Sequence, residues 1–329
     1  MKARFHKVFL PKVLIALGVG ATALSAVATE SSFPSKPLRI IHGSVPGTLV
    51  DTAARLYAER MSAYFKQPVV VEPMSGATTV IAIRNAIKAP ADGHTLLVGA
   101  TTLVVLPHTH ARAGYATRDF TPIGEMVRSP LVLVTSGSSP YTSLSELIAA
   151  AKKSPERITY ASGGVGTTNH LAAALLTRQA GVKLTHVPYK AIGAAVPDVT
   201  AGRVDFLMSA PNSVAELMKS GMLRALAISS EKRSPAFPQF PTFREAGYPD
   251  ATYEIWIGAV GPAGIPAPVR ARLGEAMEAA RNDPSLVKRV EALGQTISAV
   301  RTPAQFEAVM RADEEKLRTL VKEMNIVAE

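Results

Sequence analysis

The feature that most constrains the fold of this chain is a regular alternation of short apolar runs with helical stretches. Most of these runs are continuously apolar, which is typical of β-strands that are covered on both faces. The runs that we interpret as strands are 38–42, 68–72, 95–99, 131–135, 157–161, 184–189, 204–209, 223–229 and 253–260. Helical stretches such as 51–65 and 145–153 lie between them. The pattern predicts an α/β fold with mainly parallel sheets.

Three helix starts carry N-capping signals. Thr48 and Asp51 have capping-box spacing, with Asp in place of the usual Glu or Gln, and the stretches 143–146 and 302–305 have the full Ser/Thr-x-x-Glu/Gln form. The last of these opens a C-terminal helix whose apolar side chains share one face. Those side chains are Phe306, Met310, Leu317, Leu320, Val321 and Met324.

Two extended segments, 126–140 and 252–268, are interpreted as crossings between two domains. Proline and glycine follow each segment, and a length of 329 residues suits two domains. The predicted domains are residues 33–130 plus 254–329, and residues 131–253. A hinge of two segments leaves a cleft between the domains, where ligands commonly bind.

Residues 1–28 have the layout of a secretory signal peptide. A basic start is followed by a 16-residue apolar run that ends in Ala26-Val27-Ala28, a small-x-small cleavage site. The alternative, a membrane anchor, needs about 20 apolar residues. We therefore expect export, with cleavage near Ala28.

Composition excludes several function classes. The absence of cysteine excludes disulfides, thiol catalysis and cysteine-ligated metals. The net charge of +10 falls to +6 when the four basic residues of the signal peptide are removed. The remaining basic residues are scattered and only 6% of residues are aromatic, so nucleic-acid binding is not expected.

Two glycine-rich turns, in the stretches 40–56 and 160–176, are candidate ligand sites. Each follows a predicted strand and opens a helix, whose N-terminus has unpaired N–H groups and a partial positive charge that suit an anion. The structural alternative is that strand-to-helix connections in general favour glycine and a Ser or Thr cap. Two such turns, one in each predicted domain, favour a shared ligand site beyond the carboxyl ends of the strands.

Other chemistry finds less support. A phosphate-binding loop needs Lys after the last glycine, but Thr167 follows Gly166. His108 and His110 alternate as metal ligands can, but no further ligand cluster follows, and we predict a loop pair. No nucleophile–base–acid set is visible, and His170 is expected to pack or hydrogen-bond near its loop. No cofactor, metal or catalytic residue is therefore predicted.

Two residues at strand ends in the second predicted domain complete the candidates. Tyr189 follows one strand and either lines the cleft or belongs to a half-buried core. Ser209 ends another strand, directly before Ala210 and Pro211.

Ordered segments along the whole mature chain resemble the Bug-type periplasmic receptors, the substrate-binding proteins of the tripartite tricarboxylate transporter family. The most specific are the His-Val-Pro-Tyr-Lys and Leu-Arg-Ala-Leu-Ala segments. The full set is SFPSKPLRII, PVVVE, ADGHTLLVG, SLSELIAAAKKSP, ITYASGGVGTTNHLAAALL, LTHVPYKA, LRALAISSEKRSPAFPQFPTFREAGYP and WIGAVGPAGIPAPV.

The resemblance implies a two-domain, Venus-flytrap periplasmic-binding-protein fold of type II-like form with two hinge crossings. Family members typically hold small carboxylates through backbone N–H groups, hydroxyls and ordered waters of two glycine loops. By position, the contacts would be Ser44, Val45, Pro46, Gly47 and Thr48, with Asp51 in support; Gly76 and Ala77 in the next loop; and Ser162, Gly164, Gly166 and Thr167, with His170 in support.

The chain departs from the family pattern in the first predicted domain. The usual Pro-Phe-Pro-Pro-Gly-Gly loop is Gly-Ser-Val-Pro-Gly-Thr at 43–48, so Ser44 replaces an aromatic residue and Thr48 a glycine. The next loop, usually Asn-Arg-Pro-Gly-Ala-Gly-Gly, is Pro-Met-Ser-Gly-Ala-Thr-Thr at 73–79. These changes put the usual ligand in question.

The resulting hypothesis is a monomeric, periplasmic solute-binding protein that captures a small organic anion and is not an enzyme. Its partners would be the membrane subunits of a transporter, or a sensor. Two alternatives remain open: a receptor for an uncharged or aromatic compound, and an exported hydrolase.

Overall fold

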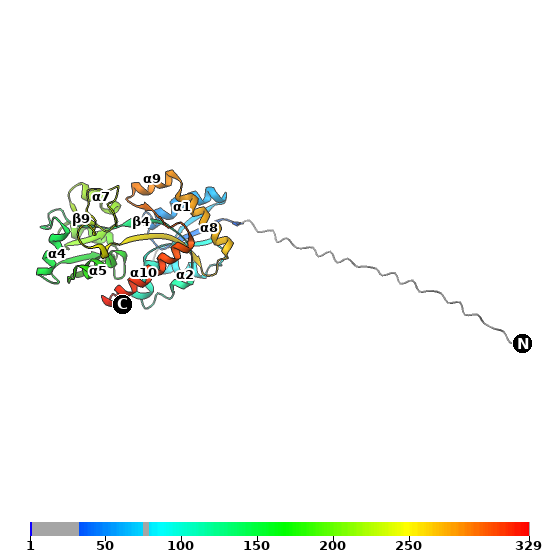
Figure 1. Cartoon of the computed structure of the whole chain (residues 1–329), viewed down its shortest axis with the longest axis horizontal. Helices are drawn as coiled ribbons and strands as arrows, with labels where there is room; N and C mark the ends of the chain where they lie inside the picture. Colours follow the sequence, from blue (N-terminus) through cyan, green and yellow to red (C-terminus); the bar gives the residue numbers. More distant parts are fainter. Residues whose placement is uncertain (2–32, 75–78, 329) are drawn as a thin grey trace. The chain divides into compact units, whose positions relative to one another are not determined.

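Two mixed β-sheets organise the protein in the computed structural model, which describes residues 33–74 and 79–328 together with Met1 (Figure 1). Residues 33–329 form one compact unit. The predicted signal peptide, and Gly76 and Ala77 of the predicted site, lie outside the described residues.

The first sheet has the strand order β11-β4-β10-β3-β1-β2 and the second has the order β7-β6-β8-β5-β9. The strands of the first sheet are β1 (Leu38–His42), β2 (Val69–Pro73), β3 (Thr95–Ala100), β4 (Phe120–Pro130), β10 (Glu254–Pro262) and β11 (Thr296–Ile297). Those of the second are β5 (Val132–Ser136), β6 (Thr159–Ser162), β7 (Thr185–Pro188), β8 (Phe206–Ser209) and β9 (Leu223–Ile228).

Helices accompany each sheet, and we refer to each sheet with its helices as a lobe. The first lobe includes α1 (Leu49–Phe65), α2 (Val80–Lys88), α3 (Thr102–Thr109), α8 (Ala267–Arg281), α9 (Pro284–Ala292) and α10 (Pro303–Glu323). The second includes α4 (Leu144–Lys153), α5 (Thr168–Ala180), α6 (Ile192–Thr200) and α7 (Pro211–Lys219). Figure 1 shows α4, α5 and α7 on one side, α1, α2 and α8 on the other, and β4 between them. The predicted α/β fold is confirmed, whereas the predicted domain boundaries stay a prediction.

The prediction of mainly parallel sheets is wrong. Among the described strands, four pairings are parallel and five are antiparallel. Every antiparallel pairing involves β4, β5 or β10, the strands that lie directly before or after a crossing between the sheets. Only the βαβ units around β1 and β6 keep the parallel arrangement that the alternating pattern predicts.

The two crossings between the sheets are joined to each other through Ser229. The chain leaves the first sheet at Leu131 and returns to it at Tyr253. The Leu131 N–H donates to the Ser229 hydroxyl oxygen at 2.8 Å, and that hydroxyl donates to the Tyr253 carbonyl at 2.5 Å. The crossings therefore lie side by side as one bonded connection.

One buried cluster runs through both lobes. It contains Ile41 of β1, Leu133 of β5, Leu171 of α5 and Phe306 of α10, all at most 1% exposed. Two further clusters belong to single lobes, one between the first sheet and helices α1 and α8, the other between the second sheet and helices α6 and α7. The lobes thus share part of their core.

The capping signals at 143–146 and 302–305 and the apolar face of the C-terminal helix are borne out locally, except that the Glu146 side chain accepts from the Thr142 N–H instead of the Ser143 N–H. The Thr302 hydroxyl accepts from the Gln305 N–H at 3.2 Å, and the Gln305 side chain accepts from the Thr302 N–H at 3.1 Å. The predicted apolar face of α10 is buried from Phe306 to Val321.

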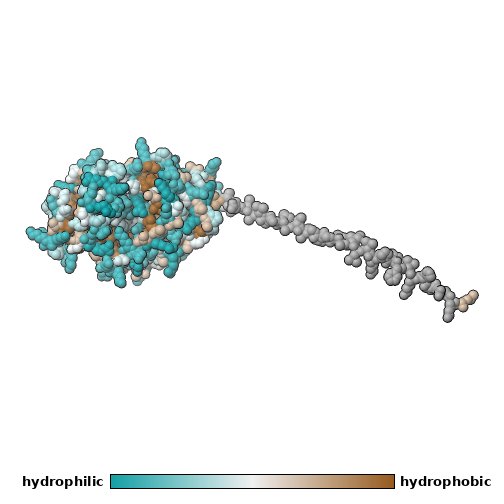
Figure 2. Space-filling view, in the orientation of Figure 1, coloured by the Kyte–Doolittle hydropathy of each residue, from teal (hydrophilic) through white to brown (hydrophobic). Residues whose placement is uncertain are grey.

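In the described ranges, none of the helices has the length and apolar character of a membrane-spanning segment. Figure 2 shows a largely hydrophilic face with a narrow hydrophobic strip between α7 and α1.

Candidate functional site

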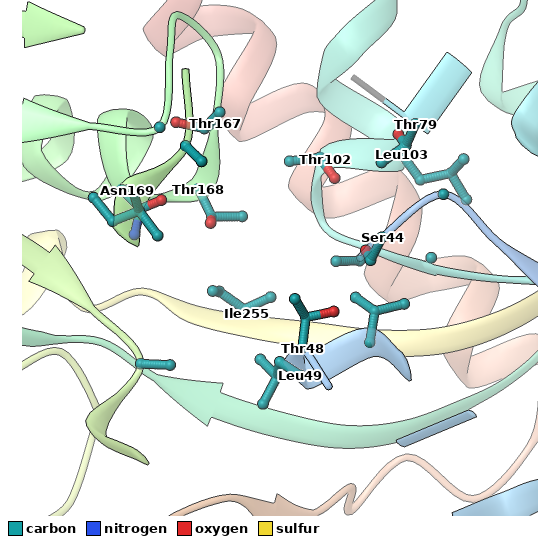
Figure 3. Close-up of a pocket in the computed structure, with 18 of the residues that line it drawn as sticks. Ser44, Thr48, Leu49, Thr79, Thr102, Leu103, Thr167, Thr168, Asn169 and Ile255 are labelled. Atoms are coloured by element: carbon teal, nitrogen blue, oxygen red, sulfur yellow. The ribbon is translucent and has the colours of Figure 1, made fainter. Parts of the chain in front are cut away.

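A cavity of about 450 Å³ lies between the two lobes (Figure 3). None of the described residues that line it has a charged side chain. Its neutral polar side chains are Ser44, Thr48, Thr79, Thr102, Thr167, Thr168, Asn169, Ser209, Asn212 and Ser213. Its larger apolar side chains are Leu49, Val50, Ile83, Leu97, Val98, Leu103, Leu106, Leu131, Ile192 and Ile255. In Figure 3, Thr167, Thr168 and Asn169 face Ser44, Thr79 and Thr102 across the cavity.

Among the described residues, six helices begin at the cavity, three from each lobe: α1, α2 and α3, and α5, α6 and α7. None of the six has a side-chain hydrogen bond that caps its N-terminus. Helices α4, α9 and α10, which begin elsewhere, are capped by Ser143, Asp283 and Thr302. The cavity therefore receives backbone N–H groups without intrahelical partners and the positive ends of several helix dipoles.

The two glycine loops reach the cavity with the same local geometry. In the first, the Gly47 N–H donates to Asp51 Oδ2 at 2.9 Å, and the Thr48 hydroxyl donates to the Val45 carbonyl at 2.7 Å. In the second, the Gly166 N–H donates to His170 Nδ1 at 3.2 Å, and the Thr167 hydroxyl donates to the carbonyl three residues before it at 2.7 Å.

This shared geometry explains why glycine stands at 47 and 166, and it corrects the predicted capping box at Thr48. The two glycines have φ of +81° and +74°, a conformation that glycine adopts without a steric penalty. Thr48 stands at the N-cap, but its hydroxyl donates backward into the loop instead of accepting from the helix, so the predicted capping box is wrong. The same holds for Thr167, and both helix starts stay open towards the cavity.

Behind the first loop, the buried carboxylate of Asp51 is paired with the half-exposed Arg55 and hydrogen-bonded to the buried His42. Its carboxylate lies 3.0 Å from His42 Nε2 and 3.0 Å from the Arg55 guanidinium. Burial raises the pKa of Asp51, but the hydrogen bonds from Arg55 and from the Gly47 N–H outweigh it, and the net pKa is lowered. Asp51 is therefore charged at neutral pH.

Behind the second loop, the corresponding acceptor is a neutral imidazole. The His170 ring stacks on the His186 ring at 3.9 Å between centroids, and His186 Nε2 lies 2.6 Å from the Ser162 hydroxyl. Burial, with a smaller contribution from His186, lowers the pKa of His170 to about 3. The bond from the Gly166 N–H assigns the tautomer: Nδ1 accepts and Nε2 carries the proton.

The structure brings about half of the predicted contact residues together. Those that line the cavity are Ser44, Gly47, Thr48, Gly166, Thr167 and Ser209. Asp51 and His170 lie behind the loops and hold them, as supporting residues would.

Five predicted contact residues do not line the cavity. Val45 is 62% exposed at the outside of its turn, and Pro46 is exposed beside it. The Ser162 hydroxyl is used inside the second loop, where it accepts from the Gly164 N–H at 3.1 Å. The Tyr189 hydroxyl donates to Asp198 at 2.5 Å, away from the cavity.

Sequence reasoning did not name the lining residues at the starts of four further helices, although it had placed Gly76 and Ala77 in the loop before α2 and Ser209 just before α7. Thr79, Thr102, Ile192 and Asn212 belong to the first turns or N-caps of α2, α3, α6 and α7. No double glycine marks these turns, so they did not stand out. Ligands bind beyond the carboxyl ends of strands. This rule, applied to β3, β7 and β8, would have found the starts of α3, α6 and α7.

The predicted loop pair of histidines is wrong. His108 lies inside α3 and His110 directly follows that helix. His108 Nε2 lies 3.0 Å from Glu314 Oε1, and His110 Nδ1 lies 2.8 Å from the Thr109 hydroxyl, so the two rings do not converge. In the part of the chain that the structure describes, no group of three His, Cys, Asp or Glu residues is placed to hold a metal ion.

Comparison with known families and proteins gives consistent results. A family described as "Tripartite tricarboxylate transporter family receptor" matches residues 53–326. A UPF0065 protein from the tcbD-tcbE intergenic region of Pseudomonas sp. (strain P51) is 34% identical, over 96% of this chain and 95% of its own length. The protein BugT of Bordetella pertussis is 30% identical, over 94% of this chain and 96% of its own length.

Solved structures share the fold. The periplasmic binding protein BugD is 28% identical with a TM-score of 0.77, over 90% of this chain and 100% of that one. MatC from Rhodopseudomonas palustris, solved with bound malate, is 27% identical with a TM-score of 0.76, over 88% and 100%. An R. palustris protein solved with adipate is 28% identical with a TM-score of 0.79, over 90% and 99%.

Proposed function

The chain belongs to the tripartite tricarboxylate transporter receptor family, and on that premise we propose that it captures a small carboxylate in the cavity between its lobes. The observation that carries the proposal is the set of six uncapped helix N-termini around a cavity whose described lining has no charged side chain. A carboxylate would supply the acceptors that the free N–H groups lack, and the helix dipoles would stabilise its charge. Relatives that hold malate and adipate support a ligand of this class.

We propose that the protein binds its ligand without transforming it. The described lining offers hydroxyl, amide and backbone groups but no His, Asp, Glu, Lys or Cys that could act as a general acid, base or nucleophile. The His170 imidazole is behind the loop and already accepts the Gly166 N–H.

We further propose a cycle in which the lobes close on the ligand by a small rotation at the joined crossings. The bonds through Ser229 keep the two crossing segments together while neighbouring backbone adjusts. The protein would act as a periplasmic monomer and deliver its ligand to transporter membrane subunits or to a sensor. Periplasmic relatives such as BugD support the location.

A thermal-stability screen tests the proposed ligand class. The chain from Thr29 onward is unfolded and refolded to remove carried-over ligand, then heated with acetate, malate, adipate and benzoate. A ligand at 100 times its Kd stabilises the native state by about 2.7 kcal/mol, which gives a clear upward shift in Tm. The matched control for adipate is adipamide, which has the same carbon chain without charge. A shift with adipamide and none with any carboxylate would overturn the proposal in favour of an uncharged ligand.

A further inference from the structure

Two glycines lie at contacts between the lobes, beside helix starts that line the cavity. Gly166 of the second lobe lies against Thr109 of the first, where an added Cβ would be 2.7 Å from the hydroxyl oxygen. Gly294 of the first lobe lies against the second, where an added Cβ would be 2.7 Å from a ring carbon of Phe237 and 3.6 Å from Pro211. Pro211 is the first residue of α7, whose start lines the cavity. We refer to this arrangement, with both contacts made, as the closed arrangement.

Gln295, the residue that follows Gly294, has a buried side chain without a hydrogen-bond partner. The residue is 3% exposed, and neither Oε1 nor Nε2 has a partner among the described residues. Its backbone N–H does have one, the Val290 carbonyl at 3.3 Å, so the deficit is confined to the side-chain amide. An amide that is buried without hydrogen bonds is less stable than the same amide in water. The closed arrangement therefore carries an unfavourable contribution at this residue.

The unpaired amide belongs to a residue next to the first crossing between the sheets. Strand β11 pairs antiparallel with β4, with Thr296 opposite Arg128, so the same register places Gln295 opposite Ser129. Ser129 is 1% exposed and lies two residues before Leu131, where the chain leaves the first sheet. Its hydroxyl donates to the carbonyl of the next residue at 3.2 Å. Gln295 therefore lies between a contact of the two lobes and the segment that must adjust when the lobes rotate.

We infer that the turn at 294–295 opposes closure of the lobes until a ligand is bound. When the lobes open, Gly294 separates from Phe237 and water reaches the Gln295 amide. When they close, the amide loses that water and gains no partner. Bound ligand offsets this loss, so the ligand-free receptor stays open and its cavity remains accessible. A ligand binds more weakly when the competent arrangement is rarely populated, and Gln295 therefore lowers the apparent affinity. The inference rests on the proposed function.

Gln295→Met removes the amide and keeps an unbranched side chain of similar size. Calorimetry with adipate, or with the best carboxylate of the screen, is expected to show binding about tenfold tighter than in the wild type, or about 1.4 kcal/mol. Small-angle X-ray scattering is expected to give a smaller radius of gyration for the ligand-free variant than for the ligand-free wild type. Gln67→Met makes the same change at a half-buried residue in the turn before β2 and is expected to alter neither quantity. Unchanged or weaker binding by Gln295→Met would overturn the inference.

Gly294→Ala provides a test of opposite sign. The added methyl group meets the Phe237 ring when the lobes close, so affinity is expected to fall several-fold, and adding Phe237→Ala is expected to restore part of it. The matched control is Gly202→Ala, because Gly202 has the same φ of +70° but no heavy atom of the described residues within 4 Å of the added Cβ.

If Gln295→Met does not fold, Gly294→Ala decides alone, and an affinity equal to that of Gly202→Ala overturns the inference. Failure of the wild-type protein to bind any carboxylate overturns the proposed function. The scattering comparison of the ligand-free proteins then still tests the role of the turn, and an unchanged radius of gyration in Gln295→Met overturns it.

Discussion

Gly166 is constrained both by its backbone conformation and by a neighbouring side chain. Its φ of +74° is unfavourable for any residue with a Cβ, and a Cβ added there would lie 2.7 Å from the Thr109 hydroxyl oxygen of α3, in the other lobe. A larger side chain at 166 would therefore first disturb the contact between the lobes and then the ligand loop. The sequence alone could not place Thr109 beside this loop.

Gly166→Ala is predicted to be more destabilising than Gly47→Ala. Both positions have positive φ, but at Gly47 no heavy atom of the described residues lies within 4 Å of the added Cβ. The two variants share the conformational penalty, and only Gly166→Ala adds overpacking, which costs about 1–3 kcal/mol. Urea unfolding of both variants gives the difference, and equal free energies of unfolding would contradict the predicted contact.

How much of the site could be predicted from the sequence is clearest for single residues. The glycines and threonines of both loops were found because a strand-to-helix turn imposes recognisable local chemistry. The directions of side chains were not found, since they depend on distant neighbours. Tyr189 turns away because Asp198 offers an acceptor, and the Thr48 hydroxyl turns back because the Val45 carbonyl lies within reach.

At the scale of elements, the described helices that open onto the cavity lack side-chain caps, whereas three of the four described helices that begin elsewhere have one. The apolar runs in the sequence predicted nine strands, and each predicted end lies within two residues of the observed end. The agreement is close because a continuous apolar run is typical of a buried strand. The runs missed β4, whose first half includes Thr121, Pro122 and Glu125, and the two-residue β11. The predicted parallel pairing was wrong for β4, β5 and β10, because their direction depends on where the chain crosses between the sheets, which the local sequence pattern does not contain.

Two threonine variants separate structural capping from ligand binding. Thr302→Ala removes a true cap and is predicted to lower the free energy of unfolding by about 1 kcal/mol, with unchanged carboxylate affinity. Thr167→Ala removes a hydroxyl that lines the cavity and holds the loop, and is predicted to weaken carboxylate binding. Denaturation and calorimetry on both variants check the pair. Loss of affinity in Thr302→Ala, or none in Thr167→Ala, would contradict this separation.

At the scale of the whole molecule, the ordered segments of the chain predicted the family, and the comparisons confirm it. A likeness that is spread over nearly the full length carries this information even where single loops diverge. The shared core between the lobes could not be foreseen, because it joins residues such as Ile41 of β1 and Leu171 of α5 that belong to different lobes and are far apart in sequence.

This shared core predicts a single cooperative unfolding transition. The only tryptophan, Trp256, is fully buried beside the crossing, and its indole N–H donates to Asp313 at 2.8 Å. Urea unfolding followed by Trp256 fluorescence and by far-ultraviolet circular dichroism should therefore give coincident curves. A circular dichroism curve with a second step that the fluorescence lacks would mean that one lobe unfolds on its own.

The uncharged lining of the cavity has a consequence for how receptors of this kind can diversify. A substitution replaces a side chain, but it leaves the backbone N–H in place unless the new residue is proline. An anion-binding site made of backbone N–H groups at helix N-termini is therefore retained through most mutations of the residues around it. Substitution of lining side chains such as Thr79 and Thr102 would reshape the rest of the cavity. Gene duplication followed by such substitutions would yield many receptors that all bind an anionic group and differ in the rest of the ligand that they accept.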